Sequence, residues 1–392
     1  MADRYEVVVV GAGIHGAGIA QAVAAAGHSV LVLEQYDAAA QGSSSRSSKL
    51  IHGGLRYLES GEFHLVRECL RERAILLRNA PHLVDLVRFH IPVDSNTRRR
   101  PWLLALGLRV YSLFSWKPFH RVPRGSWVQL DGLRRERLDA VFSYYDAQTD
   151  DAQLTHSVLA SARSLGAEVI TGAEFTQARL ETGEVEVNYQ KNGTANRVRT
   201  CILVNAAGAW VNHVLQKVSD SSGAPVPTHD IELVQGTHIV VPGHLSHPYY
   251  LEAPQDGRAV FVVPWKDNIM VGTTEQRYQG DPAEVAPTSP EIDYLLQIYN
   301  HYFGHDFTGD DVIDVFAGLR VLPGGAGDAS GKSRETHIHL NDAHQPRVVS
   351  IYGGKLTSYR ATAEKLLRRI SRVLPEATPR ANTRSLELPL VD

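Results

Sequence analysis

Residues 42–59 gather several side chains that could do chemistry into one short segment. It reads GSSSRSSKLIHGGLRYLE, with five serines ahead of Lys49 and with His52, Arg56 and Tyr57 behind it. Hydroxyl and cationic groups of this kind bind anionic ligands, and a histidine exchanges a proton near neutral pH. A linker would lack the interspersed leucines, and a core strand would lack the serines and charges. The mixture therefore indicates a loop that is anchored to a core and holds a ligand.

A second group of residues at the N-terminus predicts dinucleotide binding. Gly11, Gly13 and Gly16 form a G-x-G-x-x-G sequence directly after a short β-branched run, and Glu34 follows 18 residues after Gly16. The glycines allow a tight turn, the approach of a pyrophosphate to the backbone and close packing of a helix. Glu34 can accept hydrogen bonds from a ribose diol, which disfavours NADP but leaves NAD and FAD open. His15, inside the motif, is expected to be a solvent-facing turn residue.

The elements around these residues predict a composite α/β (α+β) fold. Buried strands are expected at residues 5–10 and 29–33, a β-meander at 174–204, further strands at 229–280, and a strand at 347–354. Helices are expected at 14–26, 62–79, 290–303 and 355–374, and residues 144–170 are expected to be loop, helix and short strand. Nucleotide-type elements thus occur at both ends of the chain, which predicts a discontinuous nucleotide domain interrupted by a strand-rich second domain.

Charge and composition exclude several classes of protein. The net charge of −3 argues against a general nucleic-acid binder, and the two cysteines show no metal-ligand or disulfide pattern. No apolar stretch is long enough to span a bilayer, and the N-terminus does not resemble a signal peptide. Residues 98–137, however, contain ten Arg or Lys against two acidic residues. Within them, the basic and aromatic segment 98–120 predicts either an anionic membrane surface contact or a helix packed on its own domain.

A series of motifs that run in order through the chain resembles the FAD-dependent, quinone-linked glycerol-3-phosphate dehydrogenases. The motifs include GAGIHGAGIA, SSKLIHGGLRYLE, SYYDAQTDDAQL, LVNAAGAWV, QGTHIVV, VGTTEQRYQGDP, FAGLR and YGGKLTSYR. The resemblance implies a fold like that of glutathione reductase and D-amino-acid oxidase, with an FAD-binding Rossmann-type domain and an inserted mixed-sheet substrate domain. The implied FAD domain comprises residues 1–75, 143–212 and 330–374, and the substrate domain 76–142 and 213–329. Residues 375–392 are expected to be an extended tail, with the family's usual C-terminal helical domain absent.

The resemblance also implies roles for individual residues. His52 is the expected base, with His238 as the competing candidate; Arg320 and Lys355 complete the catalytic set. Arg56 and Arg334, with Arg320, are expected to hold the substrate phosphate, while Tyr57 and Thr273 position the substrate. No metal is expected. FAD contacts are expected from Gly11, Gly13, Gly16, Glu34, Gln35, Ser43, Ser44, Ser45, Ser47, Ser48, Lys49, Leu50, Gly208, Gly354, Lys355, Leu356 and Thr357.

The implied partners are glycerol 3-phosphate, a membrane quinone and an anionic membrane surface, and a homodimer is compatible with them. The implied location is cytoplasmic, peripheral to the inner membrane. The chain departs from the family pattern at Ala209 and Val321, where the family usually has proline, at His15, where it usually has asparagine, and in the glycine-rich stretch 322–336. Two alternatives therefore stay open: a related oxidase or dehydrogenase for a 2-hydroxy acid or secondary amine, and a flavin-binding protein without turnover.

Overall fold

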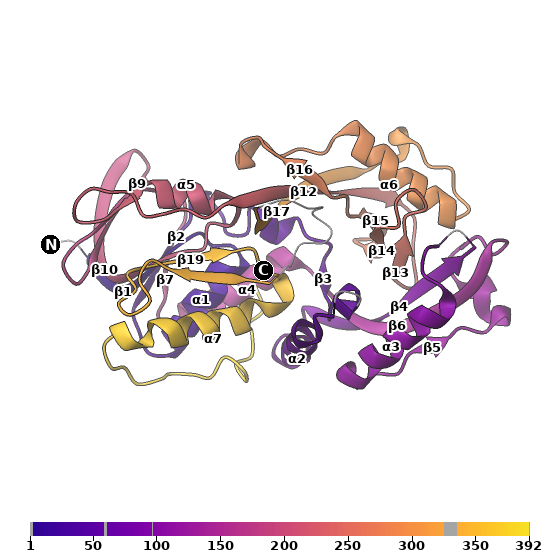
Figure 1. Cartoon of the computed structure of the whole chain (residues 1–392), viewed down its shortest axis with the longest axis horizontal. Helices are drawn as coiled ribbons and strands as arrows, with labels where there is room; N and C mark the ends of the chain where they lie inside the picture. Colours follow the sequence, from indigo (N-terminus) through magenta and orange to yellow (C-terminus); the bar gives the residue numbers. More distant parts are fainter. Residues whose placement is uncertain (1–2, 59–60, 96, 325–334, 392) are drawn as a thin grey trace.

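The computed structural model describes residues 3–58, 61–95, 97–324 and 335–391, which form two large sheets with helices packed on them (Figure 1). The first sheet has the order β11-β8-β9-β10-β1-β2-β7, and β19 joins it beside β10 and carries β18. Its strands are β1 (Asp3–Val10), β2 (Val30–Leu33), β7 (Glu168–Ile170), β8 (Ala173–Leu180), β9 (Val185–Lys191), β10 (Thr194–Asn205), β11 (Val218–Ser219), β18 (His337–Leu340) and β19 (Val348–Tyr352).

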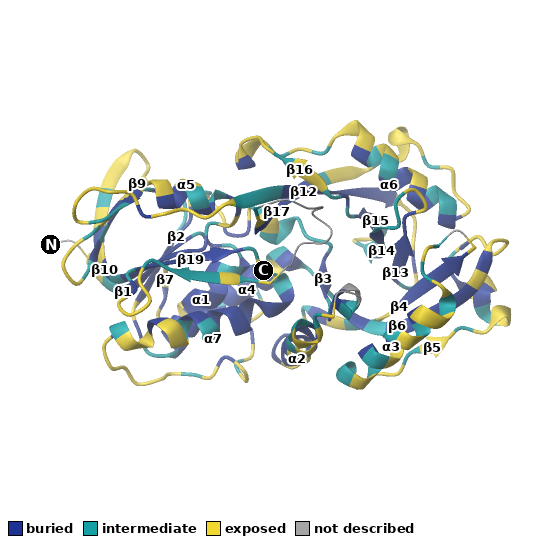
Figure 2. Ribbon diagram, in the orientation of Figure 1, coloured by how far each residue is buried: buried dark blue, intermediate teal, exposed yellow. Residues whose placement is uncertain are grey.

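Three helices cover one face of this first sheet. They are α1 (Ile14–Ala25), α4 (Asp151–Ser164) and α7 (Tyr359–Ile370), and they lie together below the strands in Figure 1. Ile19, Leu154 and Leu366 pack in one core with the strand residues Val7 and Val204. The central strands β2, β1, β10 and β19 are parallel, and β2, β19 and the last four residues of β1 and of β10 are buried, as expected of apolar runs in a parallel sheet. Figure 2 shows this burial by colour.

The second sheet has the order β16-β12-β15-β14-β13-β4-β6-β3, with β17 paired to β12 and β5 to β6. Its strands are β3 (Leu50–Ile51), β4 (Val84–Asp94), β5 (His120–Arg121), β6 (Leu138–Thr149), β12 (Ile231–Pro242), β13 (Tyr249–Glu252), β14 (Ala259–Trp265), β15 (Asn268–Gly272), β16 (Gln276–Tyr278) and β17 (Asp314–Pro323). Its helices are α2 (Phe63–Asn79), α3 (Pro101–Ser115) and α6 (Ser289–Tyr302); the short α5 (Val211–Gln216) follows β10.

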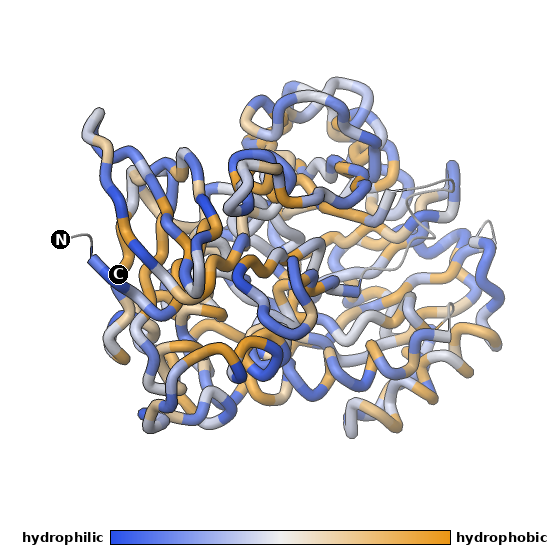
Figure 3. The backbone as a smooth tube through the Cα atoms, turned by 60° about the vertical axis from the view of Figure 1, so that its left-hand side comes forward, coloured by the Kyte–Doolittle hydropathy of each residue, from blue (hydrophilic) through white to orange (hydrophobic). Residues whose placement is uncertain are grey.

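Packing separates the chain into an apolar interior and a polar periphery. The backbone is hydrophobic mainly where it passes through the interior and hydrophilic along many peripheral loops (Figure 3). One apolar cluster surrounds Val9 and Val204 and another surrounds Val260 and Tyr299, and the first also takes in Ile51 of β3 and Ala147 of β6 from the second sheet. We propose that the two units expected from the sequence correspond to the two sheets, except that β3 and the end of β6, which were expected in the FAD unit, lie in the second sheet.

Two of the expected elements are wrong in detail. Residues 144–149 are not a loop but the end of β6, because the polar side chains that suggest a loop have partners: Arg73 donates to Asp146, and Gln148 donates to the carbonyl of Pro264. Residues 355–374 are not one helix. A 3₁₀ turn at Leu356–Ser358 precedes α7, and a second, Ser371–Val373, follows it.

Candidate cofactor and substrate site

A cavity of about 690 Å³ extends between the two sheets and takes its walls from both. From the first sheet and its loops come the N-terminal glycine turn, Glu34 and the turn around Gly208. From the second come Thr273 and Arg320, and the serine loop (residues 42–49) runs between the two. Segments that lie more than 300 residues apart in the chain, such as the glycine turn and Gly354, therefore face one space.

The glycine turn is built as the sequence predicts. Gly11 has φ of +100°, and an added Cβ would lie 2.8 Å from the carbonyl oxygen of Ala206. At Gly16 an added Cβ would lie 1.9 Å from the carbonyl oxygen of Gly11, so Gly16 serves the packing of α1 on β1 and is not part of the cavity wall. The start of α1 thereby faces the cavity, with the Gly13 cap lacking a side-chain hydrogen bond. Free N–H groups at a helix start favour a phosphate.

Glu34 and Ser44 complete this end of the cavity. The carboxylate of Glu34 accepts hydrogen bonds from the Ala12 amide at 2.7 Å and the Tyr36 amide at 3.1 Å, which fixes it at the end of β2. Burial raises the pKa of Glu34, and the amide hydrogen bonds oppose this shift. The hydroxyl of Ser44 accepts from the Ile14 amide at 2.9 Å. The serine loop is thus tied directly to the start of α1.

Most of the predicted cofactor residues line the cavity. Gln35, Ser43, Ser44, Ser47, Ser48, Leu50, Gly208, Gly354, Lys355, Leu356 and Thr357 are on its wall together with Gly11, Gly13 and Glu34. Among the residues that the structure describes, Gly16, Ser45 and Lys49 are not on the wall. Ser45 donates to the carbonyl of Gly42, which closes a turn of the loop.

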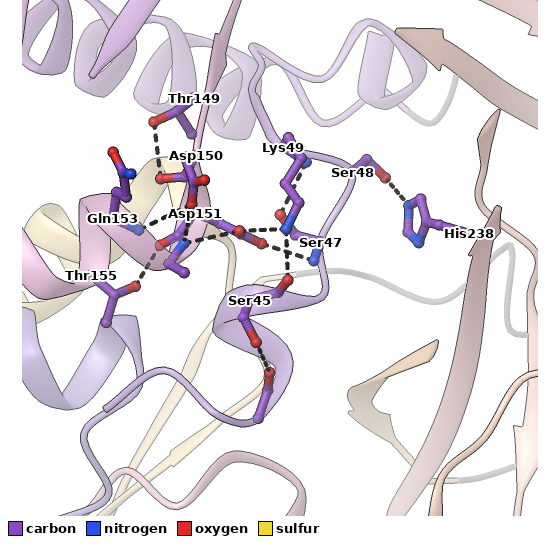
Figure 4. Close-up of polar contacts among 12 residues, drawn as sticks. Ser45, Ser47, Ser48, Lys49, Thr149, Asp150, Asp151, Gln153, Thr155 and His238 are labelled. Carbon is purple, nitrogen blue, oxygen red and sulfur yellow. Dashed lines mark hydrogen bonds and ion pairs between the residues drawn. The ribbon is translucent and has the colours of Figure 1, made fainter. Parts of the chain in front are cut away.

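Lys49 is buried, and Figure 4 shows its side chain directed toward Asp151 and Ser45. Its ammonium donates to Asp151 at 2.6 Å and to the carbonyl of Ser45 at 2.6 Å, and it lies 5.1 and 5.2 Å from the ring centroids of Trp265 and Phe316. The second oxygen of Asp151 accepts from the Ser47 amide at 2.9 Å. This buried ion pair therefore holds the serine loop from behind.

A second glycine turn lies on the cavity wall. Gly353 and Gly354 have φ of +68° and +115° and lead into Lys355. The ammonium of Lys355 lies 3.8 Å from the ring centroid of Tyr57 and 3.9 Å from the sulfur of Cys69. The hydroxyl of Thr357 accepts from the His52 amide at 3.2 Å, so this turn is joined to the segment that carries His52.

Five of the predicted catalytic and substrate side chains, those of His52, Tyr57, His238, Thr273 and Arg320, line the same cavity. The ring of His52 lies between those of Tyr57 and Phe261, with centroids 6.4 Å away on each side. Thr273 and Arg320 lie on the wall beside them, and the guanidinium of Arg320 forms an ion pair with Glu275 at 3.0 Å. Arg56 lies in the short 3₁₀ segment Leu55–Leu58, four residues after His52 in the sequence. Arg334 lies outside the described residues.

His238 differs from His52 in its surroundings. It is buried on β12, and its Nε2 lies 2.9 Å from the hydroxyl of Ser48 (Figure 4). Its ring stacks on that of Phe316, with the ring centroids 4.9 Å apart. Burial, with smaller contributions from the positive charges of Arg320 and Lys49, lowers the pKa of His238 to about 3. The imidazole is therefore neutral at neutral pH and is a weak base.

His15 is a site residue that the sequence interpretation missed. The expectation that it faces solvent is wrong, because both of its ring nitrogens are buried, and neither has a hydrogen-bond partner among the residues that the structure describes. The ring lines the cavity, and burial lowers its pKa to about 4. Its departure from the asparagine of the resembling family was the available signal. Glu275 and Asp146 on the wall were also missed: they lie in two of the motifs that carry the family resemblance, VGTTEQRYQGDP and SYYDAQTDDAQL, but no role was expected for either residue.

These features fit a bound dinucleotide such as FAD. The orphaned nitrogens of His15 lack the hydrogen-bond partners that buried polar atoms normally have. Gly208, with φ of +56°, has open space where a Cβ would be, which leaves room for a ligand against its backbone. The cavity also reaches from the start of α1 to Lys355, so one extended molecule could contact both glycine turns.

Comparisons with known proteins agree with this geometry. Residues 6–360 match the model of a family described as FAD dependent oxidoreductase. The chain is 40% identical to a glycerol-3-phosphate dehydrogenase of Pseudomonas aeruginosa, over 94% of this chain and 72% of that protein. It is 36% identical to a D-erythritol 1-phosphate dehydrogenase of Brucella abortus, over 95% and 75%. Among solved structures, a glycerol-3-phosphate dehydrogenase from Bacillus halodurans complexed with FAD has a TM-score of 0.78 and 27% identity, covering 98% of this chain and 68% of that one.

Proposed function

This chain belongs to the family of FAD-dependent oxidoreductases, and from that premise we propose that it oxidises glycerol 3-phosphate to dihydroxyacetone phosphate. The observation that carries the proposal is a single cavity with a dinucleotide-binding turn at one end and His52, Lys355 and Arg320 at the other. When bound, FAD supplies the acceptor for the hydride that leaves C2 of the alcohol. The protein must then grip the phosphate, take the hydroxyl proton and place positive charge near the cofactor.

Each of these tasks has a candidate side chain. Arg320 and Arg56 are proposed to bind the phosphate, because a guanidinium makes charge-assisted and often bidentate hydrogen bonds to it. Glu275 already holds the Arg320 guanidinium in the cavity. Lys355, with the turn at Gly353–Gly354, brings a positive charge to the cofactor side of the cavity.

For the proton we propose His52 rather than His238. Both histidines line the cavity, but the ring of His52 lies between those of Tyr57 and Phe261, and its backbone amide donates to Thr357. His238 is bonded to Ser48 and has a pKa lowered to about 3, which makes it a poor proton acceptor at neutral pH. We assign His238 to positioning the serine loop.

The main alternative is that the substrate is a longer polyol phosphate. The Brucella abortus relative, 36% identical, is named for D-erythritol 1-phosphate, which has one more carbon than glycerol 3-phosphate. An anaerobic absorbance spectrum separates the two. We expect the purified yellow protein to be bleached by glycerol 3-phosphate at a lower concentration than by D-erythritol 1-phosphate. The reverse order would assign the longer substrate, and bleaching by a 2-hydroxy acid or a secondary amine alone would overturn the proposal.

We further propose that electrons pass to a membrane quinone and that α3 places the protein peripherally on the cytoplasmic side of the inner membrane. On α3, Leu104, Leu108 and Tyr111 are buried, and the opposite face exposes Trp102, Leu103, Leu106 and Leu113, followed by Trp116, which is 91% exposed. Arginines precede and interrupt this surface, at residues 98–100 and 109. Such a surface suits the headgroup region of an anionic bilayer. Within the described ranges, the structure has no helix that could cross a membrane.

A liposome sedimentation assay tests this surface. We expect the protein to sediment with anionic vesicles and to lose most of that binding when Trp102, Leu106 and Leu113 are changed together to serine. Ile313, which is 56% exposed and lies outside α3, provides the matched control, since Ile313→Ser should leave binding unchanged. Full binding by the triple variant would remove α3 from the proposed contact.

A further inference from the structure

A buried carboxylate on β6, Asp146, holds the backbone of the segment that carries His52. Its Oδ1 accepts a hydrogen bond from the Gly53 amide at 3.0 Å and from Nη1 of Arg73 at 2.6 Å. Its Oδ2 accepts from the hydroxyl of Tyr111 at 2.9 Å. Asp146 is 2% exposed, so its charge is balanced by these partners rather than by bulk water.

Tyr111 reaches the same amide from α3. Its hydroxyl oxygen also accepts from the Gly53 amide, at 3.0 Å, while its own proton is donated to Asp146. Burial and the charge of Asp146 raise the pKa of Tyr111 well above its ordinary value, so the hydroxyl keeps the proton it donates. The Gly53 amide is therefore shared between two acceptors that are also bonded to each other.

Arg73 and Thr357 complete the arrangement from two further elements. Arg73, on α2, donates from the same nitrogen to Asp146 and to the carbonyl of Tyr145 at 2.8 Å. On the neighbouring residue, the His52 amide donates to Thr357. Two consecutive backbone amides therefore donate to side chains of different elements: the His52 amide to Thr357, and the Gly53 amide to Asp146 and Tyr111. At Gly53 an added Cβ would lie 2.3 Å from the Tyr111 hydroxyl, so the backbone sits directly against it.

We infer that Asp146, Tyr111 and Arg73 form a positioning unit, which sets the place of His52 in the cavity by holding the Gly53 amide. This inference rests on the proposed function, in which His52 takes the substrate proton. Tyr111 is not on the cavity wall among the described residues, and no cofactor-binding role is assigned to it. Loosening the unit should therefore slow proton removal while leaving the binding of FAD and of the substrate phosphate nearly intact.

Tyr111→Phe tests the unit with a minimal change, because it removes only the hydroxyl and keeps the ring in its core. We expect kcat to fall about tenfold or more, since small displacements of a reacting group have effects of this size. KM and the FAD content should stay within about twofold of the wild type. We also expect faster hydrogen exchange at the amides of residues 52–54, measured on the FAD-loaded protein without substrate.

Tyr249→Phe is the matched control. Tyr249 is fully buried and donates to Asp131 at 2.8 Å, so it has the same type of hydrogen bond in a different apolar cluster of the second sheet, and among the described residues it does not line the cavity. A merely structural role predicts that both variants lose thermal stability with kcat unchanged. The positioning role predicts that only Tyr111→Phe changes kcat and the exchange at residues 52–54.

The two proposals fail in different ways. If glycerol 3-phosphate does not reduce the wild-type flavin, the proposed function is wrong, and exchange at residues 52–54 still decides whether the unit holds the turn. If the flavin is reduced and Tyr111→Phe leaves both kcat and that exchange at wild-type values, the positioning unit is refuted and the proposed function stands. Where a variant yields little folded protein, Asp146→Asn offers a second test, since it keeps one oxygen for the Gly53 amide but removes the charge that pairs with Arg73 and replaces the oxygen that accepts from Tyr111 by an NH2 donor. The positioning role again predicts a lower kcat and faster exchange at residues 52–54.

Discussion

The buried ion pair behind the serine loop gives a quantitative prediction. The side chains of Lys49 and Asp151 are 5% and 0% exposed, and their charged atoms lie 2.6 Å apart. Lys49→Met keeps most of the side-chain volume but leaves the Asp151 carboxylate buried without its counter-charge. Removal of one partner from a buried pair costs about 3–5 kcal/mol. Asp151 retains hydrogen bonds from the amides of Ser47 and Ala152, so we expect the lower end of that range, about 3 kcal/mol.

This free energy corresponds to a modest but measurable change in the unfolding temperature. For a chain of 392 residues, the unfolding entropy is roughly 0.8 kcal/mol per kelvin, so a loss of about 3 kcal/mol lowers the midpoint by about 4 °C. Differential scanning calorimetry of the FAD-loaded protein measures it. Arg199→Met is the control, because Arg199 pairs with Glu184 at a similar 2.8 Å but is 49% exposed. An exposed pair contributes about 1 kcal/mol or less, so the control midpoint should fall by no more than about 1 °C.

A double variant separates the ion pair from simple loss of packing. Asp151→Asn alone should cost about as much as Lys49→Met, because it leaves the ammonium buried without its counter-charge. The two changes together should cost about 3 kcal/mol rather than about 6, since no unpaired charge then remains. Costs that simply add would refute the reasoning that charge pairing holds the loop.

Three further predictions concern the proposed roles. His52→Ala should retain FAD but lower kcat by about 10²–10⁴, measured by steady-state kinetics, and full activity would end its assignment as base. Arg320→Ala should raise KM for glycerol 3-phosphate more than tenfold, because charge-assisted hydrogen bonds contribute about 1.5–3 kcal/mol; an unchanged KM would remove Arg320 from the phosphate site. Burial, with the nearby charges of His247 and Arg88, lowers the pKa of His90 to about 4. Between about pH 6.5 and pH 4, the imidazole of His90 binds a proton in the unfolded chain but not in the folded protein, so the free energy of unfolding should fall as the pH is lowered through this range. The decrease should be smaller in His90→Gln. Equal dependence of the melting temperature on pH in the two proteins would contradict this.

Local patterns predicted much of the scaffold. The strand, glycine turn and helix at residues 3–25 are present as expected, because the β-branched run, the glycines and the alanine-rich segment each favour one local structure. The meander of β8, β9 and β10 follows from its alternating apolar residues and its turns. The motif series led to the correct family, since those motifs occur together in order.

Patterns failed where a polar residue finds its partner far along the chain. Asp146 and Gln148 suggested a loop, but Arg73 and the carbonyl of Pro264 satisfy them inside a sheet. Lys49 was expected to contact the cofactor, yet Asp151, 102 residues away, draws its ammonium into the interior. His15 was expected to face solvent, and the packing of Gly354 against its ring places it in the cavity wall instead.

The segment GSSSRSSKLIHGGLRYLE shows which properties of the site follow from the sequence and which follow from the tertiary structure. The sequence alone determined that hydroxyls, a histidine and arginines occur together and that the family binds FAD, because residue types and their order along the chain carry that information. Only the tertiary structure decided which side chain faces which way. Buried charges and amides must find partners wherever the fold brings them, so Asp151 holds the loop at Lys49 and Asp146 holds it at Gly53, leaving His52 toward the cavity.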